Sequence, residues 1–139
     1  MNKIALLGIP LILAAIGVLG VYLHYYSPAE PTLEMKVAIG DLSKFGANAT
    51  CANTVIPYFV NLSFDRRKIT DADVYARLMD AEGKDVGTIQ LYYDSYREIW
   101  TSAVMYPCLP LGNYRVLANA TAIVDGRELY ATDMIEISV

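Results

Sequence analysis

The sequence is poor in the side chains that most enzymes use for acid–base chemistry and for metal binding. It holds 1 histidine, His24, and 2 cysteines among 139 residues, and charged residues make up only 19%. It contains no glycine-rich phosphate loop, no H-x-x-x-H pattern and no G-x-S-x-G pattern. These absences argue against a nucleotide-binding enzyme, a zinc hydrolase and a serine hydrolase. We therefore expect no catalytic residue, no cofactor and no metal site.

Basic residues are also scarce, which argues against nucleic acid as a partner. The 11 Lys and Arg stand against 15 Asp and Glu, so the formal net charge is -4 and the pI is about 4.8. Such a chain repels a polyanion. Hydrophobic residues, by contrast, make up 55% of the chain and the mean hydropathy is +0.31, which excludes a disordered protein. The length has room for one folded domain of ordinary size.

Much of the apolar content lies in the first two dozen residues. Residues 4–23 read IALLGIPLILAAIGVLGVYL and carry no charge. As a helix, this run extends roughly 30 Å, the thickness of a bilayer hydrocarbon core. Lys3 precedes the run and tyrosines follow it, and positive charge tends to stay in the cytoplasm. We therefore predict a transmembrane helix with an aromatic rim over residues 1–26, which places the remainder outside the cell membrane.

A cleaved signal peptide is the competing interpretation of this segment. Its apolar run would span about 7 to 15 residues and end in small residues at a cleavage site. Here the run is longer and continues into VYLHYYSP, without an A-x-A pattern. An uncleaved single-pass anchor is therefore favoured.

The segment after the anchor is divided into a stalk and a β-domain. Residues 27–31, with two prolines, predict a short stiff stalk. From residue 32 to residue 139, apolar side chains alternate with polar ones at period 2, which is typical of half-buried strands. The alternating runs cover residues 33–39, 56–64, 74–78, 89–93, 100–104, 114–120 and 129–139. Seven short strands predict an all-β fold, a seven-stranded antiparallel sandwich of two sheets.

Two residue patterns within this region predict a hairpin turn and an irregular position in a strand. Asp125-Gly126 predicts a tight hairpin turn, because both central residues of a type I′ turn need positive φ. Pro57 falls inside the second predicted strand, although proline cannot donate to a ladder. Either the strand is bulged at Pro57, or the missing N–H points to an open edge.

Residues 109–116 read LPLGNYRV and lead into an alternating strand. The phrase L-P-x-G-x-Y-x-V resembles the penultimate strand of immunoglobulin-like and fibronectin type III-like domains of prokaryotic surface proteins. The resemblance covers about 30 residues closely and the outer domain loosely, and the Cys-Trp-Cys pattern of antibody domains is missing. It implies an immunoglobulin-like architecture in which the Tyr114 hydroxyl ties back across a structural corner. Fold alone carries no function.

The two cysteines, Cys51 and Cys108, are predicted to form a disulfide. An oxidising exterior permits the bridge. Cys51 precedes the second predicted strand and Cys108 precedes the sixth, and in the sandwich these two strands run in the same direction, so that their starts share one end. Two separate buried thiols are the alternative.

Three N-x-[ST] sequons follow the anchor and predict glycosylation at Asn48, Asn61 and Asn119. Asn61 and Asn119 lie within predicted strands, on the parity opposite the core residues. If the sequons are used, the host glycosylates its surface proteins, as eukaryotes and archaea do. Together with the surface-domain resemblance, this favours an archaeal source.

Aromatic residues gather in the middle of the chain and make the best candidate for a partner surface. Rings with a polar tip are favoured at interfaces. The cluster consists of Tyr92, Tyr93, Tyr96, Trp100 and Tyr106. Acidic residues near Asp71 and around Gly83 are interpreted as solvated turns, not as calcium ligands, since the spacing of an EF-hand is lacking.

These features together predict a non-enzymatic, membrane-anchored surface protein. It would act as a structural or binding subunit of a surface assembly, with a protein partner or a second copy on the outer side. Two alternatives remain open. One is a pilin-like filament subunit, and the other is an accessory subunit of a membrane enzyme complex.

The anchor leads to a direct test. If residues 1–26 are an uncleaved helix, the mature protein keeps Met1 or Asn2 at its N-terminus and needs detergent for extraction. Intact-mass spectrometry of the protein from native membranes measures this. A mature chain that begins near Ser27 would make the protein a secreted domain instead.

Overall fold

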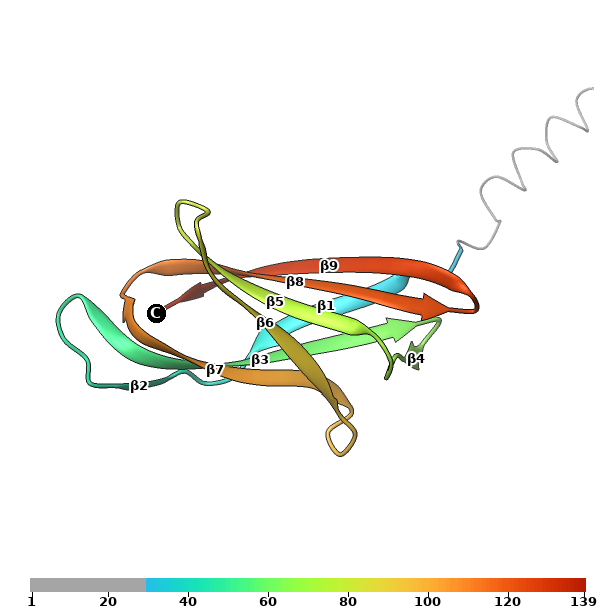
Figure 1. The fold of residues 1–139 in the computed structure, drawn as a ribbon, viewed down its shortest axis with the longest axis horizontal. Coiled ribbons are helices and arrows are strands. Elements are labelled where there is room, and N and C mark those ends of the chain that lie inside the picture. Colours follow the sequence, from blue (N-terminus) through green and yellow to red (C-terminus); the bar gives the residue numbers. More distant parts are fainter. Residues whose placement is uncertain (1–29) are drawn as a thin grey trace, which may run out of the picture. The chain divides into compact units, whose positions relative to one another are not determined.

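The computed structural model describes residues 30–139, which form an all-β structure (Figure 1). The predicted transmembrane helix and most of the predicted stalk lie outside these residues. The strands are β1 (Leu33–Ile39), β2 (Ser43–Phe45), β3 (Cys51–Phe64), β4 (Arg67–Lys68), β5 (Asp73–Asp80), β6 (Asp85–Asp94), β7 (Ile99–Pro110), β8 (Asn113–Val124) and β9 (Arg127–Ser138). Between Glu30 and Val139 no helix is long and apolar enough to cross a membrane.

The seven long strands form one nearly closed antiparallel sheet in the order β1-β3-β7-β6-β5-β8-β9, and the short strands β2 and β4 pair with β3. Strand β6 joins the two layers, since its first part pairs with β5 and its residues 92–94 pair with β7 (Figure 1). The arrangement is compatible with a sandwich or a barrel. The two layers are continuous through β6, which the strand pattern of the sequence did not indicate.

The seam, where the end strands β1 and β9 of the nearly closed sheet meet, is bridged by a side-chain hydrogen bond. The two strands lie beside each other and, through the chain of antiparallel pairs, run in the same direction. The Val37 N–H in β1 donates a hydrogen bond of 2.9 Å to the Asp133 carboxylate in β9. This carboxylate caps an edge N–H that would otherwise be open to another chain.

All seven predicted strands are present, and all of them except β1 are longer than the alternation indicated, with the largest extensions at one end of β3 and of β7. Strand β3 begins at Cys51 rather than Ile56, and β7 continues to Pro110 rather than Val104. The inward-facing residues at the start of β3 include Ala52 and Thr54, which are buried but small or polar. A pattern search that relies on large apolar residues therefore misses them.

One hairpin turn was predicted from the sequence, and a second turn was not. Asp125 and Gly126 have φ of 52° and 78°, which confirms the predicted tight turn between β8 and β9. Asp65 and Arg66 also have positive φ and connect β3 to β4 in a two-residue turn. The sequence signal for this second turn is weak, since neither residue is glycine.

Pro57 ends a ladder rather than bulging its strand. The Gly40 N–H donates to the Pro57 carbonyl at 2.9 Å, so the missing N–H of Pro57 faces the same side, where the chain leaves β1 for β2. Of the two predicted alternatives, the one in which the missing N–H of Pro57 points to an open edge describes this position better than a bulge does. The register shift of β3 lies elsewhere, between Ala52 and Thr54.

The core contains a pair of hydrogen-bonded tyrosines. Tyr58 and Tyr106 are 0% and 9% exposed, and their hydroxyl oxygens lie 2.7 Å apart. Burial and then the bond to Tyr106 raise the pKa of the Tyr58 hydroxyl above its usual value, and burial raises the pKa of Tyr106. Nearby, the Trp100 indole N–H donates to the Ile69 carbonyl at 2.9 Å. Each polar tip in this part of the core thus has a partner.

The tyrosine pair predicts a non-additive mutant cycle. Tyr58→Phe or Tyr106→Phe alone leaves a buried hydroxyl unpaired and is expected to lower the free energy of unfolding by about 1–3 kcal/mol. The double variant is expected to lose less than the sum of the two single variants, because no unpaired hydroxyl remains. Urea unfolding measures all three, with the exposed Tyr75→Phe as control. Additive losses would contradict the pairing.

Alkaline pH tests the same pair. Because both folded-state pKa values are raised, the native protein keeps two protons that the unfolded chain loses. The contribution of the protonated tyrosine pair to the free energy of unfolding is fully present below about pH 10. It is lost as the pH rises through the raised pKa values of the folded state. Thermal melting across this range is therefore expected to show a steeper loss for the parent than for Tyr58→Phe/Tyr106→Phe.

Candidate functional site

The aromatic cluster predicted as a partner surface is split by the structure. Tyr92 and Tyr96 are 64% and 95% exposed, whereas Trp100 and Tyr106 belong to the core. Tyr93 packs edge-on against Trp100, with ring centroids 5.6 Å apart. Trp100, Tyr106 and Tyr93 are therefore corrected from surface candidates to core-packing residues.

The split follows from the period of a strand. Tyr92 pairs with Thr101, and both lie on the outer side, whereas Tyr93 pairs with Trp100 on the inner side. Successive side chains of a strand point to opposite faces. Tyr96 lies beyond β6, in the loop to β7, and is the most exposed large apolar residue described.

Tyr92 instead belongs to a different surface, the outer face of the layer formed by β1, β2, β3 and β7. Its residues lie in four cross-strand rows that carry no charged side chain, and we call it the uncharged face. The rows are Tyr92–Thr101–Phe59–Ala38, Ala103–Pro57–Gly40, Met105–Val55–Ser43 and Pro107–Asn53–Phe45.

The uncharged face is accessible. Phe45 and Met105 are 53% and 49% exposed, and Ala103 is exposed in the second row. Its middle is tightly packed, since a Cβ atom on Gly40 would lie 2.9 Å from Pro57 Cγ and 3.0 Å from the Phe59 ring. An exposed sheet face with apolar side chains and no charge suits contact with another surface.

The opposite layer has a different outer face. Strands β5, β8 and β9 also expose apolar residues, among them Tyr130 and Met134, but charges are interleaved with them. Arg77 pairs with Asp85 and Arg115 with Glu136, each at 3.7 Å. Only the uncharged face combines exposed apolar side chains with an absence of charge across four neighbouring rows of the described strands.

The three sequons occupy different places. Asn61 is exposed on β3, opposite Lys36 and two residues beyond Phe59, so it borders the uncharged face. Asn119 is half-buried on β8, between Tyr75 and Thr132 on the charged outer face. Asn48 lies in the exposed loop before β3. Glycosylation of the three stays a prediction.

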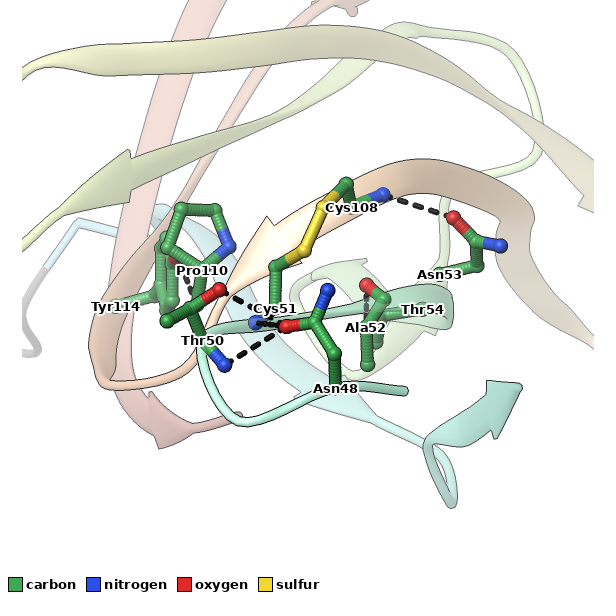
Figure 2. Close-up of a disulfide and its surroundings, with 9 residues drawn as sticks. All are labelled: Asn48, Thr50, Cys51, Ala52, Asn53, Thr54, Cys108, Pro110 and Tyr114. Atoms are coloured by element: carbon green, nitrogen blue, oxygen red, sulfur yellow. Dashed lines mark hydrogen bonds between the residues drawn. A yellow bond between two sulfur atoms is a disulfide. The ribbon is translucent and has the colours of Figure 1, made fainter. Parts of the chain in front are cut away.

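Cys51 and Cys108 form a disulfide, as the sequence predicted (Figure 2). The starts of β3 and β8 lie at one end of the domain, as expected, since the two strands run in the same direction and the Leu111 N–H donates to the Thr50 carbonyl at 3.0 Å. Cys108 lies inside β7, the neighbour of β3, before β8 begins. Here two residues of β7, Pro107 and Cys108, stand opposite the single residue Asn53. Cys108 adopts a φ of 45°, and its N–H donates to the Asn53 side chain at 2.9 Å. This bulge brings the two Cα atoms to 4.9 Å.

The sequon at Asn48 is part of the same end of the domain. The Asn48 Oδ1 atom accepts hydrogen bonds from Thr50 N, Thr50 Oγ1 and Cys51 N at 2.8–2.9 Å (Figure 2). Tyr114, the predicted corner residue, lies nearby, and its hydroxyl donates to the Pro110 carbonyl. The disulfide, the Asn48 turn and the Tyr114 bond thus tie the start of β3 to the turn between β7 and β8.

The acidic turns have structural partners. The Asp80 carboxylate accepts N–H bonds from Glu82 and Lys84 at 3.0 and 2.8 Å, which holds the β5–β6 hairpin. The Asp94 carboxylate does the same for the next hairpin, through the N–H of Tyr96. Among residues 30–139 no group of three His, Cys, Asp or Glu lies close enough to hold a metal ion. The candidate site itself offers packing surface, and its four rows contain no Asp, Glu, Lys, Arg or His.

The disulfide leads to a stability prediction. Replacing both cysteines by serine is expected to lower the free energy of unfolding by about 4 kcal/mol, because a closed loop of this length restricts the unfolded chain. Thermal and urea unfolding measure the loss, and reduction of the parent is expected to match it. Reduction of the double variant serves as control. Free alkylation of both thiols in the native protein would contradict the bridge.

Comparisons of the chain with protein-family models, with curated proteins and with solved structures found no match.

Proposed function

We propose that this chain is a non-enzymatic, single-pass membrane-anchored protein whose β-domain lies outside the cell. It acts as a structural or binding subunit of a surface assembly. The observation that carries this proposal is the uncharged face, where Tyr92, Met105 and Phe45 are about half exposed or more and no charge interrupts four rows of residues. Burial of such a surface against a partner is favourable.

The outside location draws on two features. The disulfide between Cys51 and Cys108 is typical of proteins in oxidising compartments. The uncharged run at residues 4–23, with Lys3 before it, supports an anchor with its C-terminal side outside. The sequons, which all follow this run, are consistent with the same side.

The strand arrangement supports an immunoglobulin-like architecture. The order β1-β3-β7 followed by β6-β5-β8-β9 has the form of two layers joined by β6, and the long strand β8 is the penultimate strand of the chain. Tyr114 begins that strand and bonds back to the Pro110 carbonyl, as the corner tyrosine of such domains does. This architecture is common among binding modules, and the site rather than the fold supports the function.

Three tyrosine variants test the proposal. Tyr92→Ala removes an exposed ring from the uncharged face and is expected to weaken assembly by about 1–3 kcal/mol with little loss of folding stability. Tyr96→Ala removes a still more exposed ring outside that face and is expected to change neither assembly nor folding stability. Tyr93→Ala removes a core-packing ring and is expected to lower stability by about 3–5 kcal/mol.

Purification from native membranes provides the assembly measurement. Filaments pellet as polymers, an accessory subunit co-purifies with an enzyme at fixed stoichiometry, and a surface subunit is recovered with its partner or with further copies of itself. Thermal melting of the same variants separates folding from binding. If Tyr92→Ala and Tyr96→Ala both assemble like the parent, the uncharged face is not the partner surface.

A further inference from the structure

We infer that the uncharged face binds the uncharged face of a second copy of this chain. The inference rests on the proposed function, in which this face is the contact surface, and it names the partner. It follows from the distribution of charge, from the composition of the face and from its shape.

The charge of the domain restricts how two copies approach each other. Removing Lys3 from the net charge of -4 leaves -5 on the part of the chain after the anchor. Two such domains repel each other over most of their surfaces. The rows from Tyr92 to Phe45 contain no charge, so two copies that meet there bring no like charges into direct contact.

The composition of the face favours an identical partner over a different protein. Interfaces between identical subunits are more apolar than other interfaces. Interfaces between different proteins commonly select their partner by complementary charges. The uncharged face offers none, and its exposed groups are mainly the side chains of Tyr92, Met105, Phe45 and Ala103.

The shape of the face permits this contact and limits its strength. Two sheets pack face to face by interdigitating their side chains. The second row, formed by Ala103, Pro57 and Gly40, has short side chains, which leaves room for the longer side chains of a second face. Four rows on three or four strands have a footprint of roughly 400–500 Å². A standard interface buries about 800 Å² on each partner. Association is therefore expected to be weak, and confinement of both copies to one membrane would raise their effective concentration.

The test places one charge in the centre of the face. In the full chain in detergent, Ala103→Lys is expected to raise the apparent dissociation constant at least about tenfold, since the charge would be buried against a second face. Thr132→Lys places the same charge on the outer side of β9 and is expected to leave the constant within about twofold. Analytical ultracentrifugation over a concentration series measures both, and circular dichroism verifies that both fold. Met105→Lys repeats the test at a second position.

A mixing experiment distinguishes self-association through this face from other contacts. Ala103→Lys and Ala103→Asp are each expected to stay monomeric alone, whereas their mixture is expected to associate, because opposite charges then face each other across the interface. Association that is insensitive to Ala103→Lys, as contact between the N-terminal segments would produce, overturns the inference.

The remaining outcomes separate this inference from the proposed function. If the parent stays monomeric up to about 100 µM while a different protein co-purifies from membranes and is lost with Tyr92→Ala, the face binds that protein and the inference fails alone. If the parent is monomeric and nothing co-purifies, the inference and the proposed function both fail.

Discussion

The pairing of β3 with β7 is the contact on which the rest of the domain depends. The ladder runs from Cys51–Pro110 to Val60–Trp100, and its inner side holds the Tyr58–Tyr106 hydroxyl pair. Its outer side is the middle of the uncharged face. The same two strands carry the disulfide, which is placed where the register shifts by one residue. The core, the disulfide and the candidate contact surface are therefore parts of one strand pair. A change in the register of this pair would displace all three, because a slip of one residue moves each side chain of the strand to the other face of the sheet.

The domain protects its edges in ways that suit a protein exposed to other chains. The Asp133 carboxylate occupies the seam between β1 and β9 by accepting the Val37 N–H. Pro57 ends the ladder on the β1 side of β3, where β2 takes over the pairing. Open strand edges template further pairing, and both devices oppose it. Both devices therefore agree with the proposal that a partner binds a sheet face and not an edge.

The two outer faces differ because their polar residues do. On β5, β8 and β9, ion pairs such as Arg115–Glu136 interrupt the apolar side chains, and the Asn119 sequon lies among them. On β3 and β7 the outer positions hold Val55, Pro57, Ala103 and Met105. The bordering row contains Lys36 and the sequon residue Asn61. A glycan at Asn61 would stand at the rim of the uncharged face, so glycosylation at this position and contact through the face are proposals that bear on each other.

The all-β class, the seven long strands and the hairpin at Asp125-Gly126 could be predicted from the residues alone, since alternation at period 2 and turn chemistry are local properties. The disulfide was also predicted, because the starts of the second and sixth strands lie at one end. The bulge at Pro107 and Cys108 was not predicted, because it depends on how β7 registers against β3. Which aromatic residues are buried depends on the packing of the two layers and could not be predicted from the residues alone. Tyr92, Tyr93 and Trp100 are close in sequence and similar in composition, but successive residues of a strand point to opposite faces. Because β6 changes layers, Tyr92 lies in one row with Phe59 and Ala38. The uncharged face could not be predicted from the sequence either, because it depends on the pairing of distant strands. Its members come from β1, β2, β3, β6 and β7, or lie beside them, and no local pattern records which residues of distant strands stand side by side.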